Sequence, residues 1–443
     1  MKHRKNMTTK FQPLSFEDTP IYFTIHGIWE DTNEMLGIID EQTQSYIIFF
    51  LAIIGILVYG VSVFFMIVSF FWSHVYLHRK PDSNLLSDSN LPGVSIIKPL
   101  MGVDPLLEIN LESHFLMDYP KFELLFCVQD EQDEAIALVN KLCEKYPEVD
   151  VSLFIGGRDG IINPMVHNMA PAYDNAKYDL VWISTSRIKS NTDIILDMIC
   201  KLQKPNVAVC HQMPFFLDQK GFAATVEKIY FGGAMARYYL GFNAVNLCCC
   251  TGMSYMFKKP LLDELNGLNW YGRYLAEDYF LTKALHDKGY RLVVSAFPAQ
   301  QNVVVSSVCG YKDRMVRWLR LRLNMMPLVS GVVEPLSECI ALGLYGAWCA
   351  HYFLNMNFYI FFGAHIGTWI FYDYFQLRAV NNGPVMFSKI EFLFAWIVRE
   401  LLAIWIFIEA ILSPRTVKWG RHTYRVTLGG HTEVLKNKSK LNL

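Results

Sequence analysis

The sequence has almost no net charge, because 40 lysines and arginines face 41 aspartates and glutamates, for a formal charge of −1. Such a chain has no overall field to attract nucleic acid, so we expect no nucleic-acid partner. Charged residues are scarce at 18%, whereas hydrophobic residues make up 52% of the 443 positions. This balance is too apolar for an ordinary soluble protein and too charged for a pure bundle of membrane spans. It favours a soluble domain joined to a few membrane segments.

Signatures of zinc sites and of secretion are also missing. The ten cysteines are scattered, apart from the adjacent Cys248, Cys249 and Cys250, and no Cys-x-x-Cys pair has zinc spacing. We therefore expect free thiols, as in a reducing compartment. No short apolar run follows Met1, so we expect no cleaved signal peptide.

Long apolar runs do occur, near both ends of the chain. Tyr46–Trp72 contains no charged residue, is long enough to cross a bilayer, and is followed by Arg79 and Lys80. Basic residues favour the cytosolic side, which predicts an anchor with a lumenal N-terminus. Cys339–Tyr372 also lacks charge and is predicted to span with its flanks or to enter as a hairpin. Phe392–Leu412 holds three charged residues, so an interfacial or re-entrant segment is favoured over a full span.

Between these runs, short apolar segments alternate with amphipathic ones. The expected strands are 94–100, 122–129, 149–155, 179–183, 207–211 and 291–295, and the expected helices include 106–116, 134–145, 192–201 and 275–288. Strands that are apolar on both faces and alternate with helices indicate an α/β fold with a mostly parallel sheet. Ligands bind such sheets at the carboxyl ends of the strands.

These patterns divide the chain into five predicted segments: an extension 1–45, an anchor 46–73, an α/β domain 90–330, a membrane-embedded region 335–412 and a basic tail 413–443. Residues 222–242 are aromatic and apolar but include three charges. We interpret them as a helix on the membrane surface. Four of its aromatic residues either enter the bilayer or face the core: Tyr230, Phe231, Tyr238 and Tyr239.

Two acidic motifs are candidates for chemistry. Asp130 follows the expected strand 122–129, where a carboxylate can reach a ligand over the sheet or cap the next helix. Glu277 and Asp278 begin the expected helix 275–288, where an acid can cap the helix or act as a general base. Either motif alone is a weak signal.

A basic motif lies further along the chain. Arg314 and Arg317 are three residues apart, on one face of a helix, and Trp318 follows them. Two guanidinium groups beside an aromatic ring suit a diphosphate. The same stretch is also compatible with contact to anionic lipid.

Taken in order, the three motifs resemble the signature of membrane-bound inverting glycosyltransferases, and the chain resembles the ceramide glucosyltransferases in particular. Further stretches similar to that family are 97–100, 127–130, 154–157, 221–225, 251–254, 276–280 and 376–378. The resemblance extends from about Val94 to Arg425. It implies a GT-A-like nucleotide-diphosphosugar transferase domain that faces the cytosol at the Golgi membrane, or at the endoplasmic reticulum. It also implies transfer of glucose from UDP-glucose to the primary hydroxyl of ceramide, with inversion and usually with a divalent cation (Mg²⁺ or Mn²⁺).

The resemblance assigns roles to individual residues. Asp278 matches the catalytic base, and Asp130 matches the family's first aspartate, near the nucleotide. The Arg314–Trp318 stretch matches the motif that helps hold the donor diphosphate. Lys98, in the 97–100 stretch, is expected to contact the UDP-sugar together with Asp130 and the two arginines.

Two positions on the donor side depart from the family pattern. Thr185 occupies the place of the second aspartate, and Met165 replaces the lysine that follows Asn163-Pro164. A hydroxyl is a poorer ligand than a carboxylate for a hard divalent cation, so metal dependence stays open. Arg187 is a candidate source of replacement positive charge. The alternatives are a weakened or inactive relative that binds lipid or a partner, and a related membrane transferase with another donor or acceptor.

Overall fold

The computed structural model describes residues 40–81, 91–304, 307–420 and 422–435. Most of the predicted extension 1–45 and the end of the predicted tail lie outside these residues. All ten cysteines lie inside them, and none of them forms a disulfide bond there.

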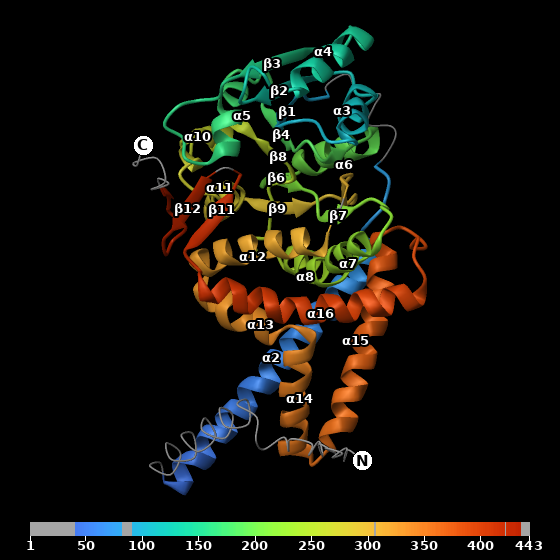
Figure 1. Ribbon diagram of the computed structural model, residues 1–443, viewed down its shortest axis with the longest axis vertical. Helices are drawn as coiled ribbons and strands as arrows, with labels where there is room; N and C mark the ends of the chain where they lie inside the picture. The colour runs from blue at the N-terminus through green and yellow to red at the C-terminus, as the bar shows by residue number, and fades with distance from the viewer. Residues whose placement is uncertain (1–39, 82–90, 305–306, 421, 436–443) are drawn as a thin grey trace, which may run out of the picture.

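A seven-stranded sheet forms the centre of the α/β unit, in the order β3-β2-β1-β4-β8-β6-β9 (Figure 1). Its strands are β1 Val94–Leu100, β2 Phe122–Val128, β3 Val151–Ile155, β4 Leu180–Ser184, β6 Val207–His211, β8 Ser254–Lys258 and β9 Arg291–Val294. Every pairing is parallel except those of β8, which is antiparallel to both β4 and β6. The predicted α/β fold with a mostly parallel sheet is therefore confirmed.

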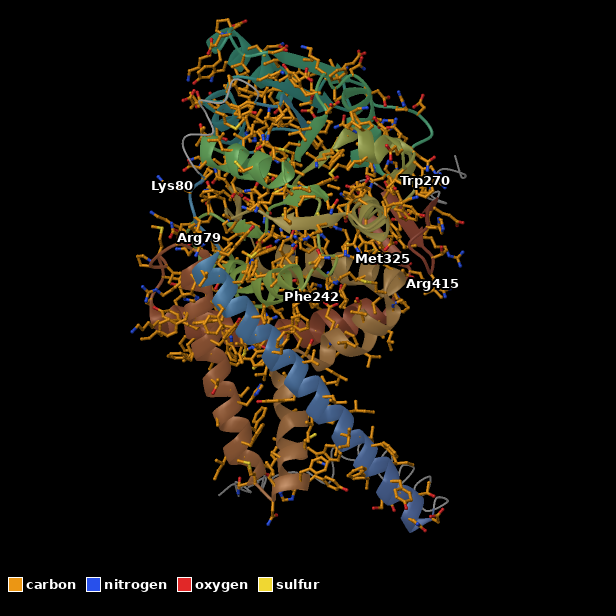
Figure 2. All side chains as sticks on the ribbon, turned by 180° about the vertical axis from the view of Figure 1, so that it is seen from behind. Arg79, Lys80, Phe242, Trp270, Met325 and Arg415 are labelled. Carbon is orange, nitrogen blue, oxygen red and sulfur yellow. The ribbon has the colours of Figure 1, made fainter. Side chains whose placement is uncertain are left out.

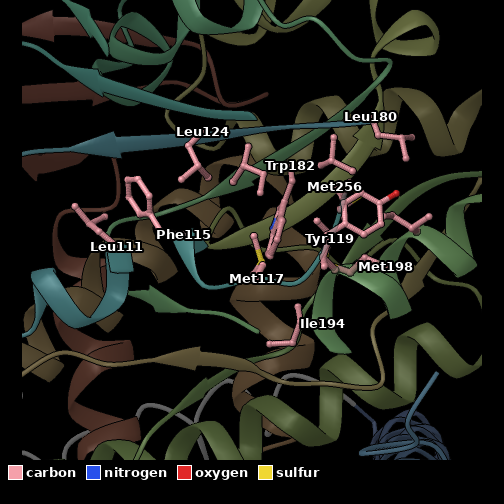
Figure 3. Packing of buried hydrophobic residues seen from close by; sticks show 14 of the residues in the cluster. Leu111, Phe115, Met117, Tyr119, Leu124, Leu180, Trp182, Ile194, Met198 and Met256 are labelled. Atoms are coloured by element: carbon pink, nitrogen blue, oxygen red, sulfur yellow. The ribbon is translucent and has the colours of Figure 1, made fainter. Parts of the chain in front are cut away.

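Helices cover both faces of the sheet. One face packs on α3 Leu107–Phe115, α4 Ala135–Lys145 and α6 Thr192–Leu202, and the other on α5 Pro164–Asp174, α9 Lys259–Asp263, α10 Gly267–Tyr271 and α11 Glu277–Asp287. Successive strand residues alternate between the two cores, so Ile96 belongs to the first and Ile97 to the second. Trp182 belongs to the first core together with Leu124, Met198 and Met256 (Figure 3). Fully burying side chains of this kind contributes about 1.5–3 kcal/mol each.

A small sheet lies beside the large one. It has the order β5-β10-β7, with β5 Ile188–Lys189, β10 Ala299–Gln301 and β7 Pro214–Phe216. Gln301 pairs with Ile188 on one side and with Phe216 on the other. The turn after β4 is thereby fixed close to the end of β7.

Three helices project away from the sheets: α2 Glu41–Val75, α14 Cys339–Leu354 and α15 Phe358–Val380 (Figure 1). Among the described residues, α2 is the one helix long and apolar enough to cross a membrane. Seen from behind, α2 runs past Phe242 and ends beside Arg79 and Lys80 at the α/β unit (Figure 2). Helices α14 and α15 form a hairpin that is joined at residues 355–357. Both predicted alternatives share this arrangement, so whether the hairpin spans a bilayer or only enters it stays a prediction.

The segment 222–242 lies inside the protein, so its interpretation as a helix that exposes aromatic rings to the bilayer is wrong. It forms α7 Phe222–Tyr230, a π-helical turn η3 Phe231–Met235 and α8 Ala236–Ala244. Phe231 and Tyr239 are fully buried, and Tyr230 and Tyr238 are partly buried. These elements pack against α2, α15 and α16, so the aromatic side chains face the core.

Helix α16, Lys389–Leu412, runs across the axes of α14 and α15 (Figure 1). On its buried face Arg399 pairs with Glu400 and with Glu338, and Glu409 pairs with Lys312 at 2.6 Å. Its other face exposes apolar side chains at every third or fourth position: Ile390, Leu393, Phe394, Ile397, Leu401, Ile404, Trp405, Ile408, Ile411 and Leu412. Paired charges on one face and an exposed apolar stripe on the other agree with the predicted interfacial segment.

The sequence does not predict a sheet in the tail, yet residues 416–435 form one. Its strands are β11 Thr416–Trp419, β12 His422–Val426 and β13 Thr432–Leu435. Val417, Tyr424 and Val426 pack with Leu275, just before α11. The sheet also contacts α12 Val308–Met325, which leads to η4 Val329–Val333 and α13 Glu334–Leu336. The predicted basic tail is therefore largely a folded part of the α/β unit.

Candidate active site

The Asp278 carboxylate is partly buried at the start of α11. Its Oδ1 accepts a hydrogen bond from the Tyr279 N–H at 2.8 Å, and a methyl group built at Gly252 would lie 3.1 Å from its Oδ2. Burial raises the pKa of Asp278 to about 6, although hydrogen bonds from the backbone of Tyr279 and Gly252 lower it. A carboxylate that titrates near neutral pH is well suited to accept a proton.

Strand pairing places this carboxylate at the carboxyl end of β4. Ser184, the last residue of β4, is opposite Ser254, and the Thr185 N–H donates to the Met253 carbonyl at 3.1 Å. Gly252 therefore lies beside the β4 turn. Because Asp278 contacts Gly252, the Asp278 carboxylate lies beside this turn as well. This is the edge at which a mostly parallel sheet binds ligands.

The neighbouring Glu277 has a structural role. It is 1% exposed, and its Oε2 accepts a hydrogen bond from Asn163 Nδ2 at 2.5 Å. Asn163 also caps α5 by accepting from the Met165 N–H at 2.8 Å. Burial, followed by the charge of Asp278, raises the pKa of Glu277. This link holds the starts of α5 and α11 together and leaves Asp278 as the acid at the edge of the sheet.

Asp130 lies in an exposed turn after β2, and it does not cap the next helix. The Ala135 N–H at the start of α4 donates to Asp133 at 2.9 Å, and the Gly102 N–H donates to the same carboxylate at 2.8 Å. Among the described residues, the Asp130 carboxylate accepts one hydrogen bond, from the Gln132 N–H at 3.0 Å through Oδ1. Its carboxylate therefore stays accessible to a ligand at the carboxyl end of β2.

The basic motif lies on α12, as the sequence predicts. Arg314 forms an ion pair with Glu227 of α7, and its guanidinium lies 5.8 Å from the centre of the Phe216 ring. Arg317 lies 5.7 Å from the centre of the Trp419 ring. Burial, followed by the charges of Arg187 and then Arg317, lowers the pKa of Arg314 to about 10. The motif therefore belongs to a larger group of like charges that includes Arg187.

Trp318 has a different position from the two arginines. Its ring packs edge-on against Phe231 of η3, with centroids 6.2 Å apart. It packs against the core that α12 shares with η3, α15 and α16. Trp318 therefore orients α12 by packing.

Lys98 lies in the core of the protein, which contradicts its expected contact with the UDP-sugar. It is fully buried on β1, and its ammonium donates to the Ser184 and Thr185 carbonyls, both at 3.3 Å. His114 Nδ1 donates to the Asn110 carbonyl, so its Nε2 accepts from Lys98 at 3.2 Å. Burial lowers the pKa of Lys98 well below its ordinary value. Lys98 thus holds the β4 turn from beneath.

We expect Lys98→Met to destabilise the protein by about 1–3 kcal/mol, because the Ser184 and Thr185 carbonyls lose a buried donor. Thermal unfolding of the purified protein measures this loss. Lys141→Met is the matched control, since Lys141 is exposed and pairs with Glu108 at the surface; its effect should stay within about 0.5 kcal/mol. Equal effects of the two substitutions would contradict the supporting role.

The residues at the β4 turn do not fit a divalent cation. Within the described part of the chain, no three His, Cys, Asp or Glu side chains lie close enough together to hold a metal ion. Thr185 offers a hydroxyl where a hard cation prefers a carboxylate, and Arg187 adds a positive charge two residues later. The hydroxyl of Thr185 and the guanidinium of Arg187 are hydrogen-bond donors, which suit an anion.

Sequence reasoning missed two contributors to the site, Glu227 and His114. A signal for Glu227 was present, because an acid within an apolar helix needs a cationic partner. No comparable signal marked His114, whose contact with Lys98 depends on the packing of α3 over β1 and β4.

Comparison with known proteins gives a consistent picture. Residues 61–432 match the model of glycosyl transferase family 21. The chain is 40% identical to ceramide glucosyltransferase 1 of Caenorhabditis elegans, over 88% of this chain and 83% of that protein. It is 26% identical to the ceramide glucosyltransferase of Komagataella phaffii, over 77% and 84% of the respective chains. A similar solved structure is the mannosyltransferase PcManGT of Pyrobaculum calidifontis in complex with GDP-Man and Mn²⁺, with 16% identity, a TM-score of 0.48 and coverage of 82% and 98%.

Proposed function

We propose that this chain, which belongs to glycosyl transferase family 21, transfers glucose from UDP-glucose to the primary hydroxyl of ceramide with inversion. The observation that carries the proposal is the partly buried Asp278 carboxylate at the carboxyl end of β4, on the same unit as the arginines of α12. Identity to ceramide glucosyltransferases over most of the chain supports the choice of donor and acceptor.

Asp278 acts as the general base. Its carboxylate takes the proton of the ceramide hydroxyl as that oxygen attacks the anomeric carbon from the face opposite the leaving group. The bond from the anomeric carbon to the β-phosphate oxygen breaks as the new C–O bond forms, which inverts the centre. UDP leaves with the bonding electrons, and Arg314 and Arg317 stabilise the negative charge that develops on its diphosphate. Asp130, exposed at the end of β2, contacts the nucleotide.

The acceptor reaches the base from the membrane side. Helix α8 packs on α2, and the loop that follows it exposes Val245 and Leu247 before it arrives at Gly252, beside Asp278. With α2 as the anchor and the apolar stripe of α16 at the interface, this loop lies close to the bilayer surface. We place the α/β unit on the cytosolic side of the Golgi membrane and the N-terminus in the lumen.

The test is expression in cells that lack glucosylceramide synthesis, followed by transfer of labelled glucose from UDP-glucose to a short-chain ceramide in isolated membranes. Glucosylceramide above the mock-transfected background is the expected result. Folded, membrane-bound protein that makes no product would overturn the proposal and leave an inactive lipid-binding relative. Transfer from another nucleotide sugar or to another acceptor in parallel reactions would identify a related transferase.

The pKa of about 6 at Asp278 predicts a pH dependence of the reaction. The base must be deprotonated, so kcat/KM should be constant above about pH 7 and fall about tenfold per pH unit well below 6. An aspartate with the ordinary pKa of 3.8 would keep its activity down to about pH 5. The rate profile between pH 4.5 and 8 distinguishes the two, and a flat profile down to pH 5 would exclude the raised pKa.

A further inference from the structure

Three arginines from two separate parts of the chain are close enough for their charges to interact, because the charge of Arg187 lowers the pKa of both Arg314 and Arg317. Arg314 and Arg317 come from α12, and Arg187 comes from the turn after β4. The Arg187 carbonyl accepts from the Asn302 N–H at 2.8 Å, which fixes the backbone of Arg187 at the edge of the small sheet.

The small sheet places the backbone of Arg187 near the ring that Arg314 contacts. Gln301 of β10 pairs with Ile188 and with Phe216, and its carbonyl accepts from the Leu217 N–H at 2.9 Å. Arg187 is thus two strands away from Phe216, the ring beneath the Arg314 guanidinium.

The charges of this cluster are not balanced by the protein. Glu227 pairs with Arg314, but among the described residues no carboxylate forms an ion pair with Arg187 or Arg317. The surplus is therefore about two positive charges. Arg314 and Arg317 are partly buried and Arg187 is exposed. Their guanidinium groups repel one another, and an anion with several acceptor oxygens relieves that repulsion.

The same turn offers poor ligands to a divalent cation. Thr185 follows Ser184 at the end of β4, and Arg187 is two residues further on. A divalent cation placed here would meet a hydroxyl and a guanidinium, whereas a diphosphate would meet donors that match its oxygens.

We propose that Arg187 joins Arg314 and Arg317 in binding the donor diphosphate, so that donor binding by this chain requires no divalent cation. The inference rests on the proposed function for the identity of the donor, UDP-glucose. In a site that binds the UDP-glucose diphosphate through a metal, the cation would neutralise the phosphate charge. Here Arg187 has that role.

Binding of UDP to the full chain in lipid nanodiscs, measured by calorimetry in EDTA, tests the proposal without requiring turnover. We expect wild-type UDP affinity to be the same in EDTA and in Mn²⁺ within about threefold. Arg187→Gln should weaken UDP binding about 10- to 100-fold, because a charge-assisted contact to phosphate is lost. Arg187→Lys should retain part of the affinity. Arg291→Gln is the matched control, since Arg291 is also exposed and begins β9.

Two results would overturn the inference: wild-type UDP binding that is lost in EDTA and restored by Mn²⁺, or Arg187→Gln binding UDP as wild type does. The melting temperature of Arg187→Gln shows whether this variant folds. If it does not fold, the UDP affinity of Arg187→Lys and the comparison of wild type in EDTA and in Mn²⁺ test the inference. The binding assay contains no ceramide, so its result is independent of glucose transfer. A chain that binds UDP without metal but transfers no glucose would refute the proposed function and leave this inference standing.

Discussion

Asp278→Asn should lower the rate of glucose transfer by about 10²- to 10⁴-fold, the contribution of a positioned general base. Asparagine keeps the shape of the side chain and can still accept a hydrogen bond from the Tyr279 N–H. It cannot take a proton from the ceramide hydroxyl. Single-turnover transfer of labelled glucose in membranes measures the loss of the chemical step, whereas kcat alone could report product release.

The donor side should be unaffected by this substitution. Asp278 faces Gly252 and the loop towards the membrane, whereas the arginines of α12 are expected to hold the diphosphate. UDP affinity should therefore stay within about threefold of wild type or increase, because a nearby negative charge is removed.

Asp287→Asn is the matched control for Asp278→Asn. Asp287 is the last residue of the same helix, is exposed, and pairs with Lys283 at 2.5 Å. Asp287→Asn should transfer glucose at the wild-type rate. If Asp278→Asn retained more than a tenth of the wild-type rate, another group would have to accept the proton, and the assignment of the base would fail.

The sequence predicts the parts of this fold whose pattern is local. Strands β1 and β6 have the predicted bounds, because each is a short apolar run with turn residues or helices around it. Strand β8 was missed, since Ser254–Lys258 begins with a serine and ends in a lysine. Its antiparallel position between β4 and β6 comes from long-range pairing that no local pattern encodes.

The candidate site divides in the same way. Asp278 and the arginines of α12 were predicted from motifs, and the structure brings Asp278 to the expected edge of the sheet. Lys98 was misassigned because its sequence position does not reveal that its ammonium points into the core, towards His114. The aromatic residues of α7 and α8 were equally ambiguous, because burial against other helices and burial in lipid select the same side chains.

Asp373→Ala should destabilise the protein by about 3–5 kcal/mol, the cost of leaving a buried charge without its partner. Asp373 of α15 and Arg237 of α8 are each 2% exposed, and Arg237 Nη2 donates to Asp373 Oδ1 at 2.7 Å. Trp396 of α16 donates to the other oxygen at 2.9 Å. One carboxylate thus connects three helices beneath the α/β unit, and its removal leaves the donors of two of them unsatisfied.

A double-mutant cycle separates this pair from its surroundings. Arg237→Met combined with Asp373→Leu removes both charges at similar volume, so it should cost less than the sum of the two single substitutions. Unfolding in increasing SDS, monitored by tryptophan fluorescence, gives the four stabilities. Removing the exposed Lys283–Asp287 pair of α11 should change stability by less than about 0.5 kcal/mol. A cost below about 1 kcal/mol for Asp373→Ala, or strict additivity in the cycle, would mean that water reaches this pair and that packing alone holds α8, α15 and α16 together.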